Sequence, residues 1–288
     1  MCRLGHNTTF VRNPHIREAE VHDGEHHRCG WFSRGYHCGM SGGGGDERSV
    51  AQKLFAIVDA FAAREELTLT QVAAAANLPV STAHRMLASW TEWGGLERTE
   101  SGTYRVGIKL WRLGARRTTV ERLRAIARPY LEDLLEATEE NVHIAVRDGL
   151  GAVYLERISS PNAVRVISDV GTRLPLHATG VGLVLLAHSP IEVFDEVVAS
   201  KPRQYLPNTI TEEKALRRRL AEIRATGLSR SVEEMTPGAF SMAAPVVDAH
   251  GEVVAAVSII AHVERLAEPQ FALGVRMAAR GISGALGR

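Results

Sequence analysis

This 288-residue sequence has no long apolar run, no signal-peptide features and no cysteine after residue 38. The longest stretch without a charged residue, 174–191, contains two prolines and two histidines, so it is a poor candidate for a transmembrane helix. The N-terminus has no continuous apolar segment of the kind found in signal peptides. All three cysteines precede residue 40, so disulfides cannot stabilise the rest of the chain. We therefore expect a cytoplasmic protein that does not contact a membrane.

The sequence also lacks the motifs of several common enzyme classes. The segment 180–182 has no third glycine and follows no β-α-β pattern, which argues against a dinucleotide site. No Walker loop is present, and no G-x-S-x-G stands as an elbow between an expected strand and helix. His262 and Glu264 are not followed by C-x-x-C, as a zinc deaminase requires. We expect no enzyme, no catalytic residues and no cofactor.

Charge is distributed unevenly along the chain, although its net charge is only +1. Residues 1–47 carry a net charge of −1, and residues 118–288 carry −2. Residues 48–117 hold ten basic and six acidic side chains, a net charge of +4. This segment suits a small nucleic-acid-binding module attached to a near-neutral body, with a solvated surface as the alternative.

The first forty residues hold every cysteine and half of the twelve histidines. Such a composition can bind zinc. However, no cysteine or histidine pair stands beside a partner pair at zinc-finger spacing, and the tract has no apolar periodicity. It ends in a glycine run, 42–45, which is typical of a flexible linker. We expect residues 1–47 to be a disordered extension without a metal site, and Met40 to be the true start.

Three helices are predicted after the glycine run. The first has one apolar face, formed by Val50, Leu54, Ile57, Val58 and Phe61. Thr68 and Gln71 form a capping box that begins the second helix near Leu69. Asn77 follows this helix, where a left-handed residue is expected, and Pro79 suits the first turn of the third helix.

The helices on either side of Asn77 fit a helix-turn-helix, whose second helix enters the major groove of DNA. Near its start, that helix exposes hydrogen-bonding side chains, which are Ser81, Thr82, His84 and Arg85. Segments 96–99 and 103–106 then predict a hairpin, in which we expect Arg98 and Arg105 beside phosphates. The pattern predicts a winged helix-turn-helix that binds double-stranded DNA. The alternative is a generic three-helix unit with surface arginines.

The segment RSVAQKLFAIVDAF…LTLTQVAAAANLPVSTAHRMLASWTEWGGLERTESGTYRVGIKLWRLG closely resembles the N-terminal domain of IclR-type bacterial transcriptional regulators. Within LPVSTAHRML, the proline, the Ser-Thr pair and the His-Arg pair stand in family order. The resemblance covers about residues 48–288. It implies an α+β protein with a winged helix-turn-helix, a linker helix and a C-terminal GAF-like α/β effector-binding domain. It also implies a homodimer or a homotetramer.

The second half of the chain predicts alternating helices and strands. Strands are expected at 141–146, 152–158, 227–231, 240–247 and 253–261, and helices at 107–114, 120–140, 181–187, 211–225 and 269–286. Pro129 indicates a kink or break near Arg128. We therefore expect the winged helix-turn-helix at 48–110, the linker helix at 111–128 and the effector-binding and oligomerisation domain at 129–288.

Gly180 is predicted to stand at the start of an apolar helix, where free N–H groups favour an anion. From the residues alone, a plain strand-to-helix turn is the alternative. In the IclR family the matching segment opens the effector pocket, and many effectors are small organic acids. The resemblance thus implies an effector site that comprises Gly180, Val181, Ala239, Ser241, Ser258 and Ile260. It also implies that Glu233 and Glu234 hold a loop of this site. Leu183 stands where the family commonly has Lys or Arg.

Taken together, these patterns predict a DNA-binding transcriptional regulator, either a repressor or an activator. We expect its operator affinity or activity to be controlled by a small carboxylate-bearing metabolite bound in the C-terminal domain. A hydrolase-like enzyme with an attached DNA-binding-like domain is the alternative. Ser241, His177 and Asp248 supply one residue of each type for a catalytic triad, but nothing in the sequence brings them together.

Overall fold

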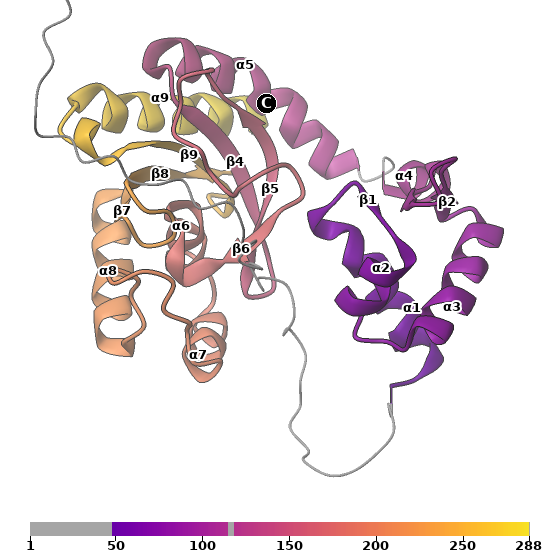
Figure 1. Ribbon diagram of the computed structural model, residues 1–288. Coiled ribbons are helices and arrows are strands. Elements are labelled where there is room, and N and C mark those ends of the chain that lie inside the picture. The colour runs from indigo at the N-terminus through magenta and orange to yellow at the C-terminus, as the bar shows by residue number, and fades with distance from the viewer. Residues whose placement is uncertain (1–47, 115–117, 288) are drawn as a thin grey trace, which may run out of the picture. The chain divides into compact units, whose positions relative to one another are not determined.

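The computed structural model describes residues 48–114 and 118–287. We call these two ranges the N-terminal part and the C-terminal part and describe each by itself (Figure 1). The expected extension, its zinc alternative and the expected start at Met40 lie outside the described residues. Within the described ranges, no helix has the length and apolar character needed to cross a membrane.

The N-terminal part consists of short helices and a three-stranded sheet. Its elements are α1 (Val50–Asp59), the 3-10 helix η1 (Ala60–Ala63), β1 (Glu66–Leu67), α2 (Leu69–Ala75), α3 (Val80–Trp93), β2 (Leu96–Arg98), β3 (Tyr104–Val106) and α4 (Ile108–Gly114). The sheet is antiparallel, with β3 between β1 and β2. The expected hairpin is therefore present, and β1, which the sequence pattern did not predict, pairs with it. This is the winged helix-turn-helix.

The core of the N-terminal part is apolar and contains residues from α1, α2 and α3. Ile57 of α1, Val72 of α2 and Leu87 of α3 have no exposed surface. The indole Nε1 of Trp90 donates a hydrogen bond to the Leu54 carbonyl oxygen, 3.0 Å away, and so ties α3 to α1. Because α3 is fixed on its inner side, its outer side is held in one orientation.

The C-terminal part contains a six-stranded antiparallel sheet and five α-helices. Its elements are α5 (Thr118–Thr138), β4 (Asn141–Asp148), β5 (Gly151–Ile158), β6 (Arg173–Pro175), the 3-10 helix η2 (Leu176–Ala178), α6 (Gly180–Ala187), α7 (Ile191–Ala199), α8 (Glu213–Thr226), β7 (Ser229–Val232), β8 (Ala239–Val247), β9 (Val253–His262), the 3-10 helix η3 (Val263–Arg265) and α9 (Pro269–Leu286). The strand order is β6-β5-β4-β9-β8-β7. Both parts confirm the expected α+β fold class.

Helices cover the two faces of this sheet in separate layers (Figure 1). On one face, α5 and α9 bury Leu131 and Phe271 against residues such as Ile144 and Val257. On the other face, α6 packs directly on the sheet, and α7 and α8 pack with it in a second apolar cluster. All eight residues of α6 are buried. The start of α6 therefore lies inside the fold.

Helix α5 continues through Pro129. Of the kink or break expected near Arg128, the break is therefore wrong, and the kink stays a prediction. A proline inside a helix removes one backbone hydrogen bond. Here the apolar face continues on both sides of it, because Leu123 and Ala127 precede Pro129 and Leu131 and Leu134 follow it in the same buried cluster. Tertiary packing of this face outweighs the local cost of the proline.

Candidate functional site

The turn between α2 and α3 has the geometry that the sequence predicts. Thr68 caps α2, and the side chain of Gln71 accepts a hydrogen bond from the Thr68 backbone, which completes the capping box. Asn77 adopts φ = 51°, in the left-handed region that asparagine tolerates. Arg48 donates hydrogen bonds to the carbonyl oxygens of Ala76 and Asn77, at 2.9 and 2.5 Å. This cation neutralises the C-terminal end of α2 and so stabilises the turn.

Helix α3 separates a buried face from an exposed one. Ala83, Met86 and Leu87 are buried. Of the four residues expected to meet DNA, Ser81, His84 and Arg85 are exposed and Thr82 is half-buried. Hydrogen-bonding side chains are thus presented on the first two turns of a rigidly packed helix, as base recognition in a major groove requires.

The hairpin places its two arginines in different environments. Arg98 is exposed and lies 5.9 Å from the centre of the Tyr104 ring. Arg105 is also exposed, but its Nε and Nη2 atoms lie 3.2 and 3.1 Å from Glu97 Oε2. The Ile108 N–H and then Arg105 lower the pKa of the Glu97 carboxyl. Arg105 therefore has a protein partner already.

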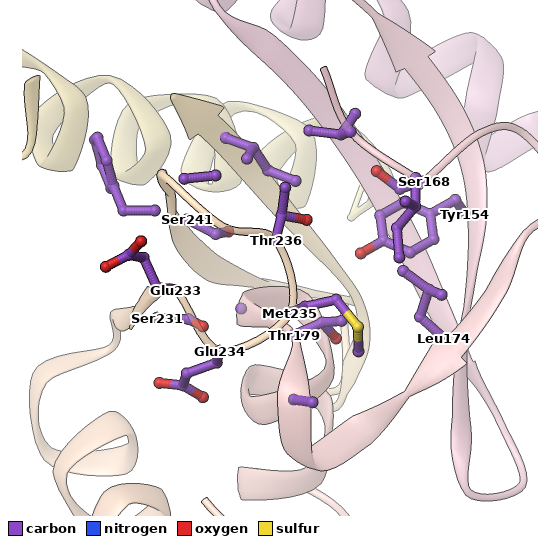
Figure 2. A pocket seen from close by; sticks show the side chains of 17 residues that line it. Tyr154, Ser168, Leu174, Thr179, Ser231, Glu233, Glu234, Met235, Thr236 and Ser241 are labelled. Atoms are coloured by element: carbon purple, nitrogen blue, oxygen red, sulfur yellow. The ribbon is translucent and has the colours of Figure 1, made fainter. Parts of the chain in front are cut away.

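The C-terminal part contains a cavity of about 420 Å³ that opens to solvent (Figure 2). It lies between the start of α6, strands β5, β8 and β9, and the loops that precede β6 and β8. Its lining residues are Tyr154, Val166, Ile167, Ser168, Leu174, Ala178, Thr179, Gly180, Ser231, Glu233, Glu234, Met235, Thr236, Ala239, Phe240, Ser241 and Ile260.

Thr179 and Gly180 shape the inner end of this cavity. Thr179 is the N-cap of α6, and its Oγ1 accepts a hydrogen bond from the Gly182 N–H at 3.1 Å. A Cβ atom on Gly180 would stand 2.5 Å from Ser241 Oγ, so a side chain there would collide with β8. Glycine at position 180 lets the helix begin directly against the sheet.

The acidic pair holds the loop before β8. Glu233 Oε1 accepts a hydrogen bond from the Gly238 N–H at 2.8 Å. Glu234 Oε1 forms an ion pair of 3.1 Å with Arg219 of α8, although burial raises the pKa of the Glu234 carboxyl. Thr209 Oγ1 donates to the Glu234 carbonyl oxygen at 2.6 Å. Both residues line the cavity, and Figure 2 shows their carboxylates directed away from Tyr154.

A buried histidine, His143, packs behind the part of the cavity wall formed by Tyr154 and Ser168. The sequence analysis did not predict its role. His143 Nε2 lies 3.1 Å from Ser168 Oγ, and its ring packs edge-on against Tyr154 with centroids 5.3 Å apart. Burial and then the charge of Arg157 lower the pKa of His143 to about 3, so its ring is neutral. Asn141 Nδ2 donates to the Val164 carbonyl oxygen at 2.7 Å. These contacts fasten residues 164–168, which we call the strap, to β4.

The structure brings four of the six expected effector-site residues to one cavity. Gly180, Ala239, Ser241 and Ile260 line it. Val181 and Ser258 are not among the lining residues, although both are buried nearby. Val181 lies in the α6 cluster, and Ser258 lies on β9 opposite Ala243 and His143. Tyr154, Ser168, Ser231 and Met235 line the cavity without having been predicted. The described residues contain no cluster of three or more histidine, cysteine or acidic side chains suited to a metal ion.

Two family models match the two parts of the chain. The IclR helix-turn-helix domain matches residues 50–100, and the bacterial transcriptional regulator IclR C-terminal domain matches residues 116–284. The glycerol operon regulatory protein of Streptomyces coelicolor is 33% identical over 227 residues, which cover 77% of this chain and 89% of that protein. The regulator BhcR of Paracoccus denitrificans is 33% identical over 236 residues, which cover 78% of this chain and 83% of that protein.

A similar arrangement is found in a solved structure, an IclR homolog from Microbacterium hydrocarbonoxydans complexed with 4-hydroxybenzoate. Its sequence is 33% identical to this chain, and the two structures superpose with a TM-score of 0.75. The match covers 83% of this chain and 99% of the homolog. The matches span both the helix-turn-helix and the domain that contains the cavity, and the curated relatives are named as regulators. The chain therefore belongs to the IclR family of bacterial DNA-binding transcriptional regulators.

Proposed function

We propose that this protein is a ligand-responsive transcription factor whose operator affinity depends on a small carboxylate-bearing metabolite. The observation that carries this proposal is the cavity at the start of α6, in a chain that also presents a recognition helix. Hydroxyl groups and the N-terminal end of a helix are suited to a carboxylate. The complex of the Microbacterium homolog with 4-hydroxybenzoate, a small aromatic acid, supports the same ligand class.

In this proposal, α3 lies in the major groove of the operator. Ser81, Thr82, His84 and Arg85 face the base edges, and Arg85 can bind guanine with two hydrogen bonds. Arg98 lies beside a phosphate. Arg105 does the same only if it shares its guanidinium between that phosphate and Glu97.

The protein is proposed to act as a homodimer or homotetramer. Exposed apolar side chains on α4 support self-association, since Ile108, Trp111 and Leu113 are each more than half exposed. A pair of recognition helices then meets two half-sites about one helical turn of DNA apart. We retain the boundaries 48–110, 111–128 and 129–288 for the DNA-binding domain, the linker helix and the effector domain.

For the effector site, we propose that Gly180, Ala239, Ser241 and Ile260 contact the metabolite directly. Val181 and Ser258 then act from behind the wall, by packing against residues that line it. Two serines on the same sheet face allow a matched test. Ser241→Ala is expected to weaken effector binding by about 0.5–1.5 kcal/mol, as the loss of one hydrogen bond does. A similar loss in Ser258→Ala would show that the second serine also contributes.

The test of the proposed function uses operator DNA selected from a random library by binding to the full chain. The dissociation constant for this DNA is measured by fluorescence anisotropy with and without 4-hydroxybenzoate, and that of the acid is measured with and without DNA. Linkage requires both constants to change by the same factor. A chain that selects no DNA sequence would refute the proposal. An acid that binds while operator affinity stays the same would refute the regulatory mechanism.

A further inference from the structure

The polar groups of the cavity wall gather at one end. Thr179 caps α6, and the position of a Cβ atom on Gly180 is 2.5 Å from Ser241 Oγ. Ser231 is paired with Ser241 across β7 and β8. The Tyr154 phenol is close enough to the Thr179 hydroxyl to interact with it. Hydroxyl groups from four segments of the chain therefore surround the start of α6.

The remaining wall is mainly apolar. Val166 and Ile167 of the strap, together with Leu174, Met235 and Ile260, line it (Figure 2). The remainder of a ligand that reaches the hydroxyl groups must therefore contact these apolar side chains. Burial of that body contributes about 25 cal/mol for each Å² of apolar surface removed from water.

No lysine, arginine or histidine lines the cavity in the ranges that the structure describes. The nearest carboxylates, Glu233 and Glu234, already have partners, and they add negative rather than positive charge to the surroundings. A helix N-terminus is equivalent to roughly half a positive charge. The Thr179 hydroxyl already donates to the Pro175 carbonyl oxygen, and the Ser231 hydroxyl donates to Glu234. One carboxylate can be held by the partial charge of the helix and by the Ser241 and Tyr154 hydroxyls, whereas a second would be buried without compensation.

Tyr154 is the most deeply buried of these polar groups. Its side chain is 2% exposed, and its ring rests edge-on against His143, which the Ser168 hydroxyl holds in turn. Figure 2 shows its hydroxyl directed toward the space between Thr179 and Thr236. Burial raises the pKa of this phenol, so it stays protonated and can donate a hydrogen bond.

We propose that the cavity selects an effector with an apolar body and at most one negative charge, and that Tyr154 is the specificity-determining residue that binds its polar group. This inference rests on the proposed function, because it concerns the same site. It adds the charge class of the ligand and excludes dicarboxylates and phosphate monoesters, which carry about two charges at neutral pH.

Three probes with one shared skeleton test this selection on the full chain by isothermal titration calorimetry. They are benzoate with one charge, benzyl alcohol with none and terephthalate with two. Benzoate is expected to bind at least 100-fold more tightly than terephthalate, because the second carboxylate finds no cation. Benzyl alcohol is expected to bind more weakly than benzoate but more tightly than terephthalate.

Tyr154→Phe removes one hydroxyl and keeps the ring that packs on His143. It is expected to lower benzoate affinity about tenfold, as the loss of a hydrogen bond to a charged group does, and benzyl alcohol affinity about threefold. Tyr130→Phe on α5 is the matched control, since Tyr130 lies in the cluster on the opposite face of the sheet, and it should leave both affinities unchanged.

The inference is overturned if terephthalate binds as tightly as benzoate, or if none of the probes binds at millimolar concentration. Unchanged benzoate affinity in Tyr154→Phe would overturn the role of that residue. These results are distinct from failure of the proposed function. If benzoate binds with the expected selectivity and leaves operator affinity unchanged, the charge selection stands and the regulatory proposal falls.

Discussion

Replacement of Gly180 by alanine tests the close contact between α6 and β8. The new Cβ atom would stand 2.5 Å from Ser241 Oγ, 3.1 Å from Ser241 Cβ and 3.6 Å from Ala243 Cβ. The Ser241 hydroxyl must therefore move, at an overpacking cost of about 1–3 kcal/mol. Alanine regains up to about 1 kcal/mol over glycine in a helix. We expect Gly180→Ala to lower the free energy of unfolding by about 1–2 kcal/mol.

A second substitution separates this collision from other effects. Adding Ser241→Ala removes the Oγ atom and leaves the Cβ contact of 3.1 Å, which needs a shift of only a few tenths of an ångström. The double variant should therefore be more stable than the two single changes predict by addition, with a coupling of about 1 kcal/mol. Gly284→Ala is the control, because among the described residues no atom outside the neighbouring helix backbone lies within 4 Å of a Cβ atom there. It should be neutral or slightly stabilising.

The chain itself provides an internal reference for these measurements. Trp90, Trp93 and Trp111 lie in the N-terminal part, the fourth tryptophan is Trp31, and none lies in the C-terminal part. Urea unfolding followed by tryptophan fluorescence therefore does not follow the C-terminal part. Far-UV circular dichroism, in contrast, follows both parts. The destabilisation should be seen by circular dichroism, with the fluorescence transition unchanged. Strictly additive effects of Gly180→Ala and Ser241→Ala would refute the steric argument.

Three further predictions concern other contacts. In mobility-shift titrations, Arg85→Ala should cost about 1–3 kcal/mol of operator affinity and relax sequence preference, whereas Arg98→Ala should weaken binding to all sequences and reduce the salt slope by about one; unchanged operator affinity in Arg85→Ala would refute its placement. Arg124→Met removes the 3.0 Å ion pair with the mostly buried Glu156 and should lower the free energy of urea unfolding by about 1–2 kcal/mol; full stability would refute the importance of this pair. The pKa of His143 is about 3 in the folded chain and 6.5 in an unperturbed histidine. As pH falls, the His143 ring is therefore protonated in the unfolded chain before it is protonated in the folded chain. Stability present above pH 6.5 should decline toward pH 3 by at most about 1.4 kcal/mol per pH unit, and His143→Gln should flatten this part of the pH profile of urea midpoints.

Local sequence signals predicted most of the N-terminal part correctly. The capping box of Thr68 and Gln71 and the left-handed Asn77 depend on near neighbours, so a short window of sequence contains them. The core face of α3 follows from helical periodicity in the same way. The contact of Arg48 with the end of α2 spans 28 positions, and no local pattern indicates it.

The cavity was predictable only where the resemblance or a helix start pointed to it. Gly180 and Ser241 belong to that group. Tyr154 and Ser168 do not, because their place in the wall depends on His143 and on the pairing of β4 with β5. The break expected at Pro129 failed for the opposite reason, since packing on both sides of the proline outweighed the local signal that it should end the helix.

Strand β5 contains a bulge in its pairing with β4, and this bulge determines where β5 can lose a residue. Ala145 pairs with Tyr154 and Ile144 pairs with Glu156, so Leu155 is an extra residue without a partner on β4. The extra residue lets Glu156 point toward α5 while Tyr154 stays on the cavity side. Deletion of Leu155 should therefore keep every pairing partner and lose only one leucine side chain from the core. Deletion of Val153 instead should move Tyr154 by one position and turn its side chain to the opposite face of the sheet. We therefore expect β5 to tolerate deletion of Leu155 but not deletion of Val153.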